Sequence, residues 1–315
     1  MTLLLSRPVL EGLLDPVACM AGLRSGFTAG PAEVAPSRTV AALPGTGTAT
    51  ALLPGLVEGI PAYTVKVNAK FPGRRPALRG VVCLHDLESG ELLALLDSAT
   101  VTAWRTGLAA ALGTHALARP DARTITVIGA GAQAELVMRG LPTLRDLGGL
   151  TVCDTDAGRA AAFAERHAAG RPASVVADPR TAVKDAAIVI VATWSRRPLL
   201  HAADIAPGTQ VTSLGADEPG KAELSTDLLE SARVVVDDIP LAMETGALGN
   251  AGLGVEHAAG TLGDLLRGQV PGRVKAREIT VYAPVGLPWQ DLSLAWTAYR
   301  AARDAGAGQD FDFLG

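Results

Sequence analysis

The chain has 315 residues, which is enough for two domains that each bury a core of ordinary size. With 48% hydrophobic and 19% charged residues, the composition is that of a globular protein and excludes an intrinsically disordered one. The net charge of −4 offers no basic surface, so neither nucleic acid nor an anionic membrane is expected as a partner.

The sequence also limits the cellular setting and the kinds of site. Cys19, Cys83 and Cys153 form no C-x-x-C pair, so we expect reduced thiols in a cytoplasmic protein. The opening "MTLLLSRPVLEG" lacks the apolar region of a signal peptide, and the most apolar stretch, 186–194, is too short to span a bilayer. The five histidines are scattered, without H-E-x-x-H, so we expect no metal site.

Residues 1–116 predict an α+β domain, either catalytic or dimerising. The stretch "AYTVKVNAKF" at 62–71 alternates in the manner of a half-exposed strand. A hairpin is predicted over 79–98, with its turn at "ESG", and a helix over 100–118 leads into the next domain.

Residues 117–286 predict a second domain of the α/β class, a Rossmann-type doubly wound parallel sheet. Short β-branched runs alternate there with alanine-rich helical stretches, which indicates parallel strands covered on both faces. The predicted strands are "TITVI" from Thr124, 150–154, 173–178, 186–193, 209–215 and 233–238. An amphipathic helix at 287–306 follows, and we expect 287–315 to complete the first domain.

The stretch "VIGAGAQA" contains the pattern G-x-G-x-x-A of a dinucleotide-binding turn. Gly129 permits the tight turn, Gly131 lets the backbone approach a pyrophosphate, and Ala134 allows the helix to pack closely on its strand. The candidate cofactor-binding residues here are Gly129, Ala130, Gly131, Ala132 and Gln133, joined by Thr106 and Thr193.

Asp154 ends the next predicted strand, 23 residues beyond Gly131, where a ribose-binding carboxylate is expected. A carboxylate there accepts hydrogen bonds from the 2′-hydroxyl and repels a 2′-phosphate, which favours NAD(H) over NADP(H). The alternative is that Asp154 only caps the helix that begins near Ala157. Asp156 and Arg159 lie close in sequence and leave the cofactor preference open.

Polar residues stand out at four other places. Arg38 precedes apparent strand sequence, Lys66 and Asn68 share one face of the strand at 62–71, and Arg105 lies in the predicted helix at 100–118. Asp217 follows a predicted strand of the parallel sheet, at the edge where open α/β sheets bind ligands.

Taken in order, these segments resemble the ornithine cyclodeaminase/μ-crystallin family. The resemblance covers roughly Arg38 to Arg300 and rests on "KVNAKFP", "TAWRTG", "VIGAGAQA" and "LGADEPGKAEL". It implies an NAD(P)-dependent enzyme of amino-acid metabolism, and a homodimer built through the N-terminal domain. The family includes cyclodeaminases, amino-acid dehydrogenases and ketimine reductases, together with the μ-crystallins.

The resemblance also implies roles for the polar residues. Arg38 and Arg105 would clamp the substrate carboxylate, with Asn68 beside them, because guanidinium groups suit paired oxygens. Lys66 would contact the carboxylate or the reacting nitrogen. Asp217 would orient the substrate amine and move a proton.

Structural alternatives remain for these residues. Lys66 could be a solvated strand lysine, and Asp217 could cap a helix formed by "PGKAEL". Lys221 and Glu223 fit the start of such a helix better than a catalytic role, so we interpret both as structural.

Two departures from the family pattern bear on the reaction. Cyclodeaminases of the family tend to carry a glutamate just before a Met-Pro pair, whereas this chain has "TATALLPGLVEG", with Leu52 in the region and Glu58 displaced. Ala283 and Pro284 stand where the family often shows a Lys-Ser pair. The missing carboxylate argues against a diamine substrate such as ornithine or lysine, and it favours a smaller or cyclic substrate.

Three functions therefore stay open at this point. The first is an NAD(H)-dependent oxidoreductase that acts on the Cα–N bond of an L-amino acid or its cyclic imine. The second is an ornithine or lysine cyclodeaminase that releases ammonia with catalytic NAD. The third is a crystallin-like protein that binds NAD(P)H and a small ligand.

Overall fold

The computed structural model describes residues 1–315 except 30–36, 44–47, 72–73, 75 and 314–315. The chain divides into two compact units: unit 1 comprises Met1–Thr106 with Leu287–Gly315, and unit 2 comprises Gly107–Gly286. Helix α3 (Ser98–Leu117) runs through both units. The boundary between the units, after Thr106, therefore lies near the middle of this helix, whereas the boundary expected after residue 116 lies at its end.

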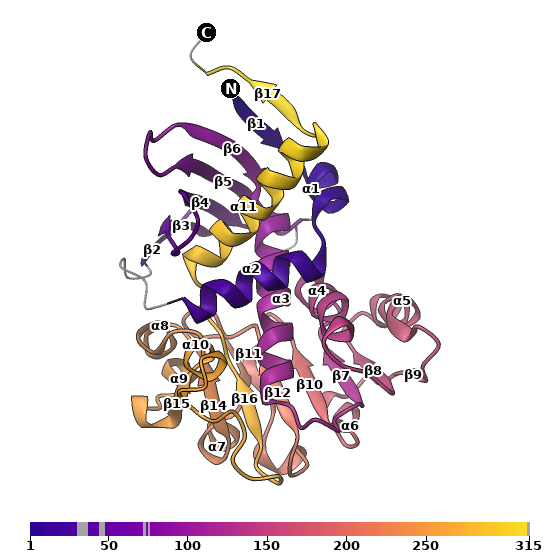
Figure 1. The fold of residues 1–315 in the computed structure, drawn as a ribbon. Coiled ribbons are helices and arrows are strands. Elements are labelled where there is room, and N and C mark those ends of the chain that lie inside the picture. The colour runs from indigo at the N-terminus through magenta and orange to yellow at the C-terminus, as the bar shows by residue number, and fades with distance from the viewer. Residues whose placement is uncertain (30–36, 44–47, 72–73, 75, 314–315) are drawn as a thin grey trace. The chain divides into compact units, whose positions relative to one another are not determined.

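Unit 1 is built on a seven-stranded sheet of order β17-β1-β6-β5-β4-β3-β2 (Figure 1). Neighbouring strands are antiparallel except β1 and β6, which are parallel. The pairing of β1 with β17 places the two ends of the chain side by side. The strands are β1 (Thr2–Leu5), β2 (Ser37–Ala42), β3 (Thr48–Gly55), β4 (Ala62–Lys70), β5 (Leu78–Asp86), β6 (Leu92–Asp97) and β17 (Gln309–Phe311).

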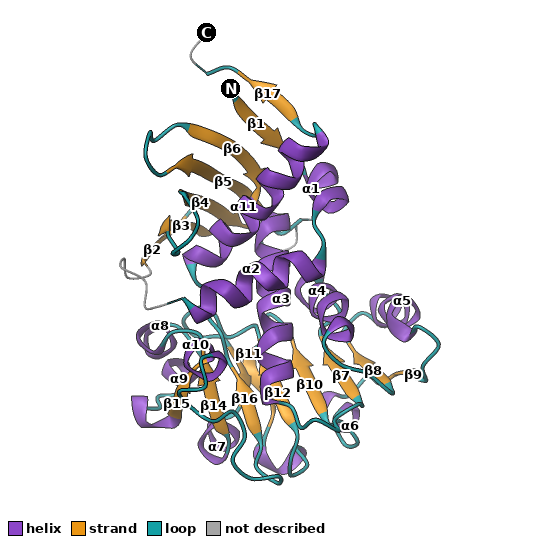
Figure 2. Cartoon of the chain, in the orientation of Figure 1, coloured by secondary structure: helices purple, strands orange, loops and turns teal. Residues whose placement is uncertain are grey.

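The C-terminal helix belongs to this unit. Helix α11 (Pro288–Ala305) packs on β3, β4, β5 and on α2 (Pro16–Thr28), while the short α1 (Arg7–Leu13) precedes α2 (Figure 2). The two long helices come very close at Gly26, where an added Cβ would lie 2.3 Å from the Trp289 ring. Phe27 meets the same ring edge-on at 4.8 Å. This contact holds the first turn of α11 against α2.

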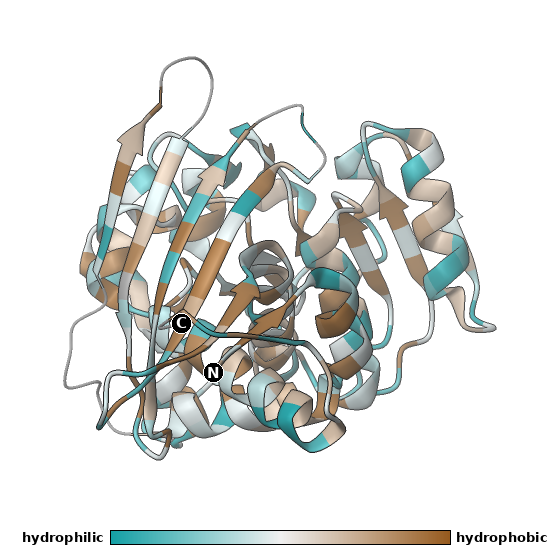
Figure 3. Ribbon diagram, turned by 90° about the horizontal axis from the view of Figure 1, so that it is seen from above, coloured by the Kyte–Doolittle hydropathy of each residue, from teal (hydrophilic) through white to brown (hydrophobic). Residues whose placement is uncertain are grey.

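Strand β4 is half-exposed, as its alternation predicts, and the side that it buries is the polar one. Lys66 is 1% exposed and Asn68 8% exposed, whereas the intervening Val67 is 48% exposed. Hydrophobic and hydrophilic segments alternate along the strands of this sheet (Figure 3). The buried polar side chains need polar partners inside the unit, since an unpaired buried charge is costly.

Unit 2 has the predicted doubly wound architecture. Its eight-stranded sheet has the order β15-β14-β16-β12-β10-β7-β8-β9, and every neighbouring pair is parallel. The chain moves from β7 to one side and then returns to β10 on the other, so the topological switch lies between these two strands. The strands are β7 (Ile125–Ile128), β8 (Leu150–Cys153), β9 (Ala173–Val175), β10 (Ile188–Val191), β12 (Gln210–Ser213), β14 (Arg233–Val236), β15 (Ala258–Thr261) and β16 (Thr280–Tyr282).

Helices and a small second sheet complete unit 2. The second half of α3 packs closely at Gly113, where an added Cβ would lie 2.4 Å from the Tyr282 ring. Strands β11 (Arg196–Leu200) and β13 (Ala222–Leu224) form a separate parallel pair. The other helices are α4 (Ala132–Gly140), α5 (Ala157–Ala168), α6 (Pro179–Ala182), α7 (Thr226–Ser231), α8 (Ile239–Glu244), α9 (Ala247–Asn250) and α10 (Leu262–Leu266), with 3-10 turns η1 (Leu141–Thr143), η2 (Ala202–Asp204) and η3 (Val255–His257).

Within the described part of the chain, no helix is both long enough and apolar enough to cross a membrane. Cys19 and Cys153 are buried and Cys83 is half-buried, and all three are free thiols.

Candidate active site

The glycine turn lies at the topological switch of unit 2. Gly129 follows β7 with φ +91°, a conformation that suits glycine, and an added Cβ would lie 2.4 Å from the Ala192 carbonyl after β10. Gly131 is the N-cap of α4, and a Cβ there would meet no heavy atom within 4 Å. Packing within the chain therefore requires glycine at 129 but not at 131, where glycine fits close approach of a phosphate to the helix N-terminus.

Asp154 follows β8 and holds the same turn. Its carboxylate accepts the Ala130 N–H at 2.8 Å and the Asp156 N–H at 2.9 Å, and pairs with the Arg159 guanidinium at 2.5 Å. Burial acts to raise the pKa of Asp154, but the hydrogen bonds from Arg159 and the two N–H groups outweigh it and hold the pKa below its usual range. The cap of α5 is Asp156, which accepts the Arg159 N–H at 3.0 Å, so Asp154 does not cap this helix.

Asp217 lies in a loop rather than at a helix start. The residues after it form a turn and then strand β13, so both the helix-cap alternative and the predicted helix start at Lys221 and Glu223 are wrong. Lys221 Nζ lies 2.8 Å from Asp217 Oδ1 and 5.0 Å from the centre of the Trp194 ring. Burial acts to lower the pKa of Lys221, but Asp217 and Glu218 outweigh it and raise the pKa, so this ammonium pairs with the Asp217 carboxylate.

Glu223 is fully buried and accepts four hydrogen bonds at the carboxyl ends of β10 and β12. Oε1 accepts the Thr193 N–H at 2.6 Å and the Thr193 hydroxyl at 2.7 Å. Oε2 accepts the Ser213 hydroxyl at 2.7 Å and the Gly215 N–H at 2.8 Å. Burial raises the pKa of Glu223, and these four donors oppose that rise. The residue thus connects two neighbouring strand ends of the parallel sheet.

In unit 1, three charged side chains from three elements meet in a buried cluster. Lys66 of β4 lies 2.5 Å from Asp291 Oδ2 of α11, and Arg105 Nε of α3 lies 3.4 Å from Asp291 Oδ1. Gln290 accepts a hydrogen bond from Arg105 at 3.2 Å, and Thr102 accepts one from Lys66 at 3.3 Å. Burial lowers the pKa of Lys66 to about 8, although Asp291 acts to raise it. Lys66 is therefore not a solvated strand lysine.

The other predicted substrate residues lie on the same face of this sheet. Arg38 is paired in register with Leu52, and Leu52 with Lys66, so the three side chains share one face, with Leu52 in the middle. Arg38 is half-buried. Asn68 is buried two residues beyond Lys66, and within the described structure its Oδ1 has no hydrogen-bond partner. Thr106 is a half-buried residue at the end of unit 1.

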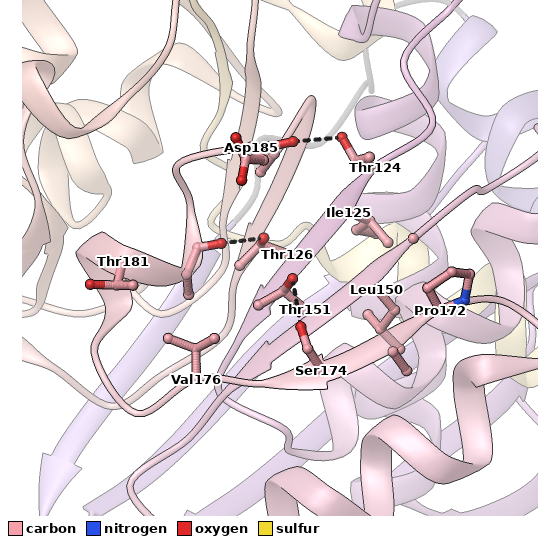
Figure 4. A pocket seen from close by; sticks show the side chains of 14 residues that line it. Thr124, Ile125, Thr126, Leu150, Thr151, Pro172, Ser174, Val176, Thr181 and Asp185 are labelled. Carbon is pink, nitrogen blue, oxygen red and sulfur yellow. Dashed lines mark hydrogen bonds between the residues drawn. The ribbon is translucent and has the colours of Figure 1, made fainter.

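A pocket in unit 2 lies away from the glycine turn (Figure 4). It is lined by the starts of β7, β8 and β9, whereas the turn follows the opposite, carboxyl end of β7. Its hydroxyls already bond within the unit: Thr126 donates to the Ala182 carbonyl at 2.8 Å, and Thr151 and Ser174 lie 3.2 Å apart. Among the described residues, no group of three or more His, Cys, Asp or Glu is placed to hold a metal ion.

The profile of the ornithine cyclodeaminase/mu-crystallin family matches residues 18–306. The chain belongs to this family. The match runs through both units, and it includes the glycine turn, Asp217, Lys66, Arg105 and the first turn of α11.

Relatives within the family have several activities. Delta(1)-pyrroline-2-carboxylate reductase of Bacillus cereus is 31% identical over 83% of this chain and 84% of that protein. Alanine dehydrogenase of Archaeoglobus fulgidus is 30% identical over 76% and 75%. L-lysine cyclodeaminase of Streptomyces rapamycinicus is 35% identical, but over only 59% and 58%.

Solved structures of family members have the same fold. An archaeal alanine dehydrogenase dimer with bound NAD matches with a TM-score of 0.91 and 27% identity, covering 99% of both chains. The Delta(1)-pyrroline-2-carboxylate reductase of Thermococcus litoralis, in complex with NADH and L-proline, also gives 0.91 and 27%, covering 98% of this chain and all of that one. The predicted family and fold class are therefore confirmed.

Sequence reasoning missed Asp291 and Gln290, and it gave Glu223 a structural role without identifying the segments that this residue connects. Asp291 and Gln290 stand in "LPWQDLSLAW", where the pattern indicates only an amphipathic helix. No local sequence signal marks either residue, because only the structure shows that both are buried in the first turn of that helix. The departures noted above remain: Glu58 is exposed in the turn after β3, and Ala283 and Pro284 are buried beyond β16.

Proposed function

We propose that the chain is an NAD(H)-dependent oxidoreductase that acts on the Cα–N bond of an L-amino acid or of its imine. The named relatives are reductases, dehydrogenases and cyclodeaminases of amino and imino acids, which supports an enzyme rather than a binding protein. Two solved relatives contain NAD or NADH, which supports NAD as the cofactor.

The observation that carries the proposal is the charge of the buried cluster in unit 1. Among the described residues, Lys66 and Arg105 face a single buried carboxylate, Asp291, so the cluster carries one more positive than negative charge. A buried charge is stabilised by an opposite one, and a guanidinium suits the paired oxygens of a carboxylate. The cluster therefore fits the α-carboxylate that amino and imino acids share.

Lys66 also fits proton transfer. Its pKa of about 8 lies close to neutral pH, so its ammonium can release a proton and regain it during turnover. We assign Lys66 both carboxylate binding and proton exchange with the reacting nitrogen. We assign to Asp217, which pairs with Lys221, the orientation of the substrate amine and the transfer of a proton.

The residues of unit 2 fit a dinucleotide. The exposed N-terminus of α4 at Gly131 and Ala132 would face the pyrophosphate, with Gln133 next to it, and Asp154 would accept hydrogen bonds from the ribose. Thr193 lies against Gly129 and would line the same site. When bound, the cofactor exchanges hydride with Cα of the substrate.

Leu52 favours a substrate with a short or cyclic apolar side chain. It lies between Arg38 and Lys66 in the register of the sheet, on their common face. A distal ammonium would need a carboxylate there, and Leu52 offers only apolar contact. We therefore favour the activity of an imine reductase or an amino-acid dehydrogenase over that of a diamine cyclodeaminase.

We also propose a cytoplasmic homodimer. The archaeal alanine dehydrogenase is described as a dimer, which supports this assembly. The free thiols support a reducing compartment. Light scattering of the purified protein should give twice the chain mass, and a monomer would contradict the dimer.

The test of the reaction follows NADH and ammonia together in the purified protein. With NADH, we expect oxidation on adding Δ1-pyrroline-2-carboxylate, its six-membered homologue, or pyruvate with ammonia. With NAD⁺, the matching L-amino acid should yield NADH, and its carboxamide should not, because the cation cluster needs a carboxylate. Ammonia released from ornithine or lysine without net NADH would instead establish a cyclodeaminase.

A pair of lysine variants tests whether Lys66 contributes to activity more than another lysine of the same strand does. Lys66→Met should lower kcat/KM by about a hundredfold or more, because a buried charged contact to substrate is lost. Lys70→Met, on the same strand but half-exposed, should stay within about threefold of the parent. Equal effects of the two variants would remove Lys66 from the site.

A further inference from the structure

Glu223 has a geometry that a carboxyl group satisfies and an amide does not. Each of its two oxygens accepts one backbone N–H, from Thr193 on one side and Gly215 on the other. A backbone N–H donates and cannot accept, so both oxygens must act as acceptors at once. In a glutamine, one of the two oxygens is replaced by an NH₂ group. In either orientation of the amide, this NH₂ donor would face one of the two backbone N–H donors.

The groups held by Glu223 lie directly against the glycine turn. Thr193 Cγ2 would be 3.0 Å from a Cβ at Gly129, and the Ala192 carbonyl 2.4 Å, so the segment after β10 forms one wall of that turn. A shift of Ala192 or Thr193 would therefore change the packing around Gly129. Glu223 fixes this wall through both the N–H and the hydroxyl of Thr193.

The same carboxylate closes the loop that carries Asp217. Its bond to the Gly215 N–H joins the two ends of the loop 215–223, and Asp217 and Lys221 pair inside the loop. The closure is tight, because a Cβ at Gly215 would lie 2.2 Å from the Thr193 carbonyl and 2.4 Å from Glu223 Oε1. One buried residue thus sets the positions of both segments.

We propose that Glu223 is a positioning residue of the dinucleotide site, which ties the wall of the glycine turn to the loop that carries Asp217. In the described structure, the backbone of β13 pairs with β11 and not with the main sheet. The link from β13 to the ends of β10 and β12 is therefore made by the Glu223 side chain. The inference rests on the proposed cofactor but not on the proposed reaction.

The experiment measures NADH binding without substrate, by fluorescence titration, together with hydrogen exchange of peptides that cover 192–195 and 213–217. Glu223→Gln should raise the NADH dissociation constant by about tenfold or more, because one buried N–H donor is left unsatisfied. It should also speed amide hydrogen exchange in both segments. Ser213→Ala removes one hydroxyl donor and keeps both N–H contacts, so it should weaken NADH by only about two- to fivefold. This milder variant tests the inference if Glu223→Gln does not fold.

The matched control is Asp237→Asn. Asp237 is a buried carboxylate that accepts the N–H groups of Val285 and Gly286 at 2.9 and 2.6 Å, so its amide creates the same donor conflict elsewhere in unit 2. It should lower stability and leave the NADH dissociation constant within about twofold. If Glu223→Gln and Ser213→Ala both bind NADH like the parent, the inference is overturned. If the parent itself fails to bind NADH, the proposed function fails first.

Discussion

The two units hold their buried charges in different ways. In unit 1, Lys66, Arg105 and Asp291 come from three elements and meet side chain to side chain. In unit 2, the buried carboxylates of Glu223 and Asp237 accept hydrogen bonds from backbone N–H groups of loops at the ends of parallel strands.

The difference shows how each unit is suited to a different anion. The cluster of unit 1 has more cation than anion, so its side chains themselves can hold a carboxylate. In unit 2, carboxylates fix the loops, and the N–H donors at the start of α4 remain directed outward for a phosphate. In the proposed function, side-chain charge would provide the carboxylate site, and oriented backbone would provide the phosphate site.

The strongest test of this difference removes the single anion of the unit 1 cluster. Asp291→Asn leaves Lys66 and Arg105 buried beside a neutral amide, and breaking such a pair costs about 3–5 kcal/mol. Denaturant unfolding of the parent and the variant measures this loss. Asp304→Asn, an exposed acid on the same helix, should change stability by less than about 0.5 kcal/mol. A loss below about 1 kcal/mol for Asp291→Asn would show that the cluster is not a paired unit.

The same comparison explains what the sequence could predict. In unit 2, local patterns identify the main features: β-branched runs identify the strands, and glycine spacing identifies the turn. Asp154 follows this turn by only 23 residues, counted from Gly131. Lys66 and Asp291 are 225 residues apart, and no local pattern indicates that helix α11 returns to β4. The buried side of β4 could not be predicted either, because the alternation in "TVKVN" indicates a half-exposed strand without deciding which side is buried, and the fold buries the side of its lysine.

Glu223 shows a different limit of sequence reasoning. "PGKAEL" is compatible with a helix start, and only the pairing of β13 with β11 makes it a strand. The four donors to Glu223 come from segments after two other strands, so tertiary structure alone gives the residue its role.

The second test asks whether Asp154 selects the cofactor. Asp154→Ser removes the carboxylate that would repel a 2′-phosphate and releases Arg159, which is then free to pair with one. The ratio of NADPH to NADH dissociation constants should move toward NADPH by about ten- to hundredfold, the size of a charged hydrogen bond. Fluorescence titration of both cofactors gives this ratio.

Asp156→Ser is the control for that variant. It keeps a side chain able to cap α5 and leaves the pair of Asp154 with Arg159 in place. The cofactor ratio should then stay within about twofold. An unchanged ratio in Asp154→Ser would exclude Asp154 from selection.

The smallest expected effect is the pH dependence of carboxylate binding by the unit 1 cluster. With a pKa of about 8 for Lys66, the fraction of its ammonium falls about fourfold between pH 7 and 8.5. The dissociation constant of pyrrole-2-carboxylate, whose ring nitrogen does not titrate in this range, should rise by about the same factor. Lys66→Met should bind it weakly at both pH values.

Stability should move in the opposite direction as the pH rises above about 8, which separates loss of charge from unfolding. The Lys66 pKa is lowered from 10.5 to about 8 by burial, so between these values the folded state binds fewer protons than the unfolded state. The free energy of unfolding contributed by this group therefore rises with pH while carboxylate affinity falls. In Lys66→Met the contribution disappears, so the difference in stability between parent and variant should change from pH 8 to pH 10 in favour of the parent. Affinity and stability that fall together in the parent would indicate that alkaline pH disrupts unit 1 and does not simply discharge Lys66.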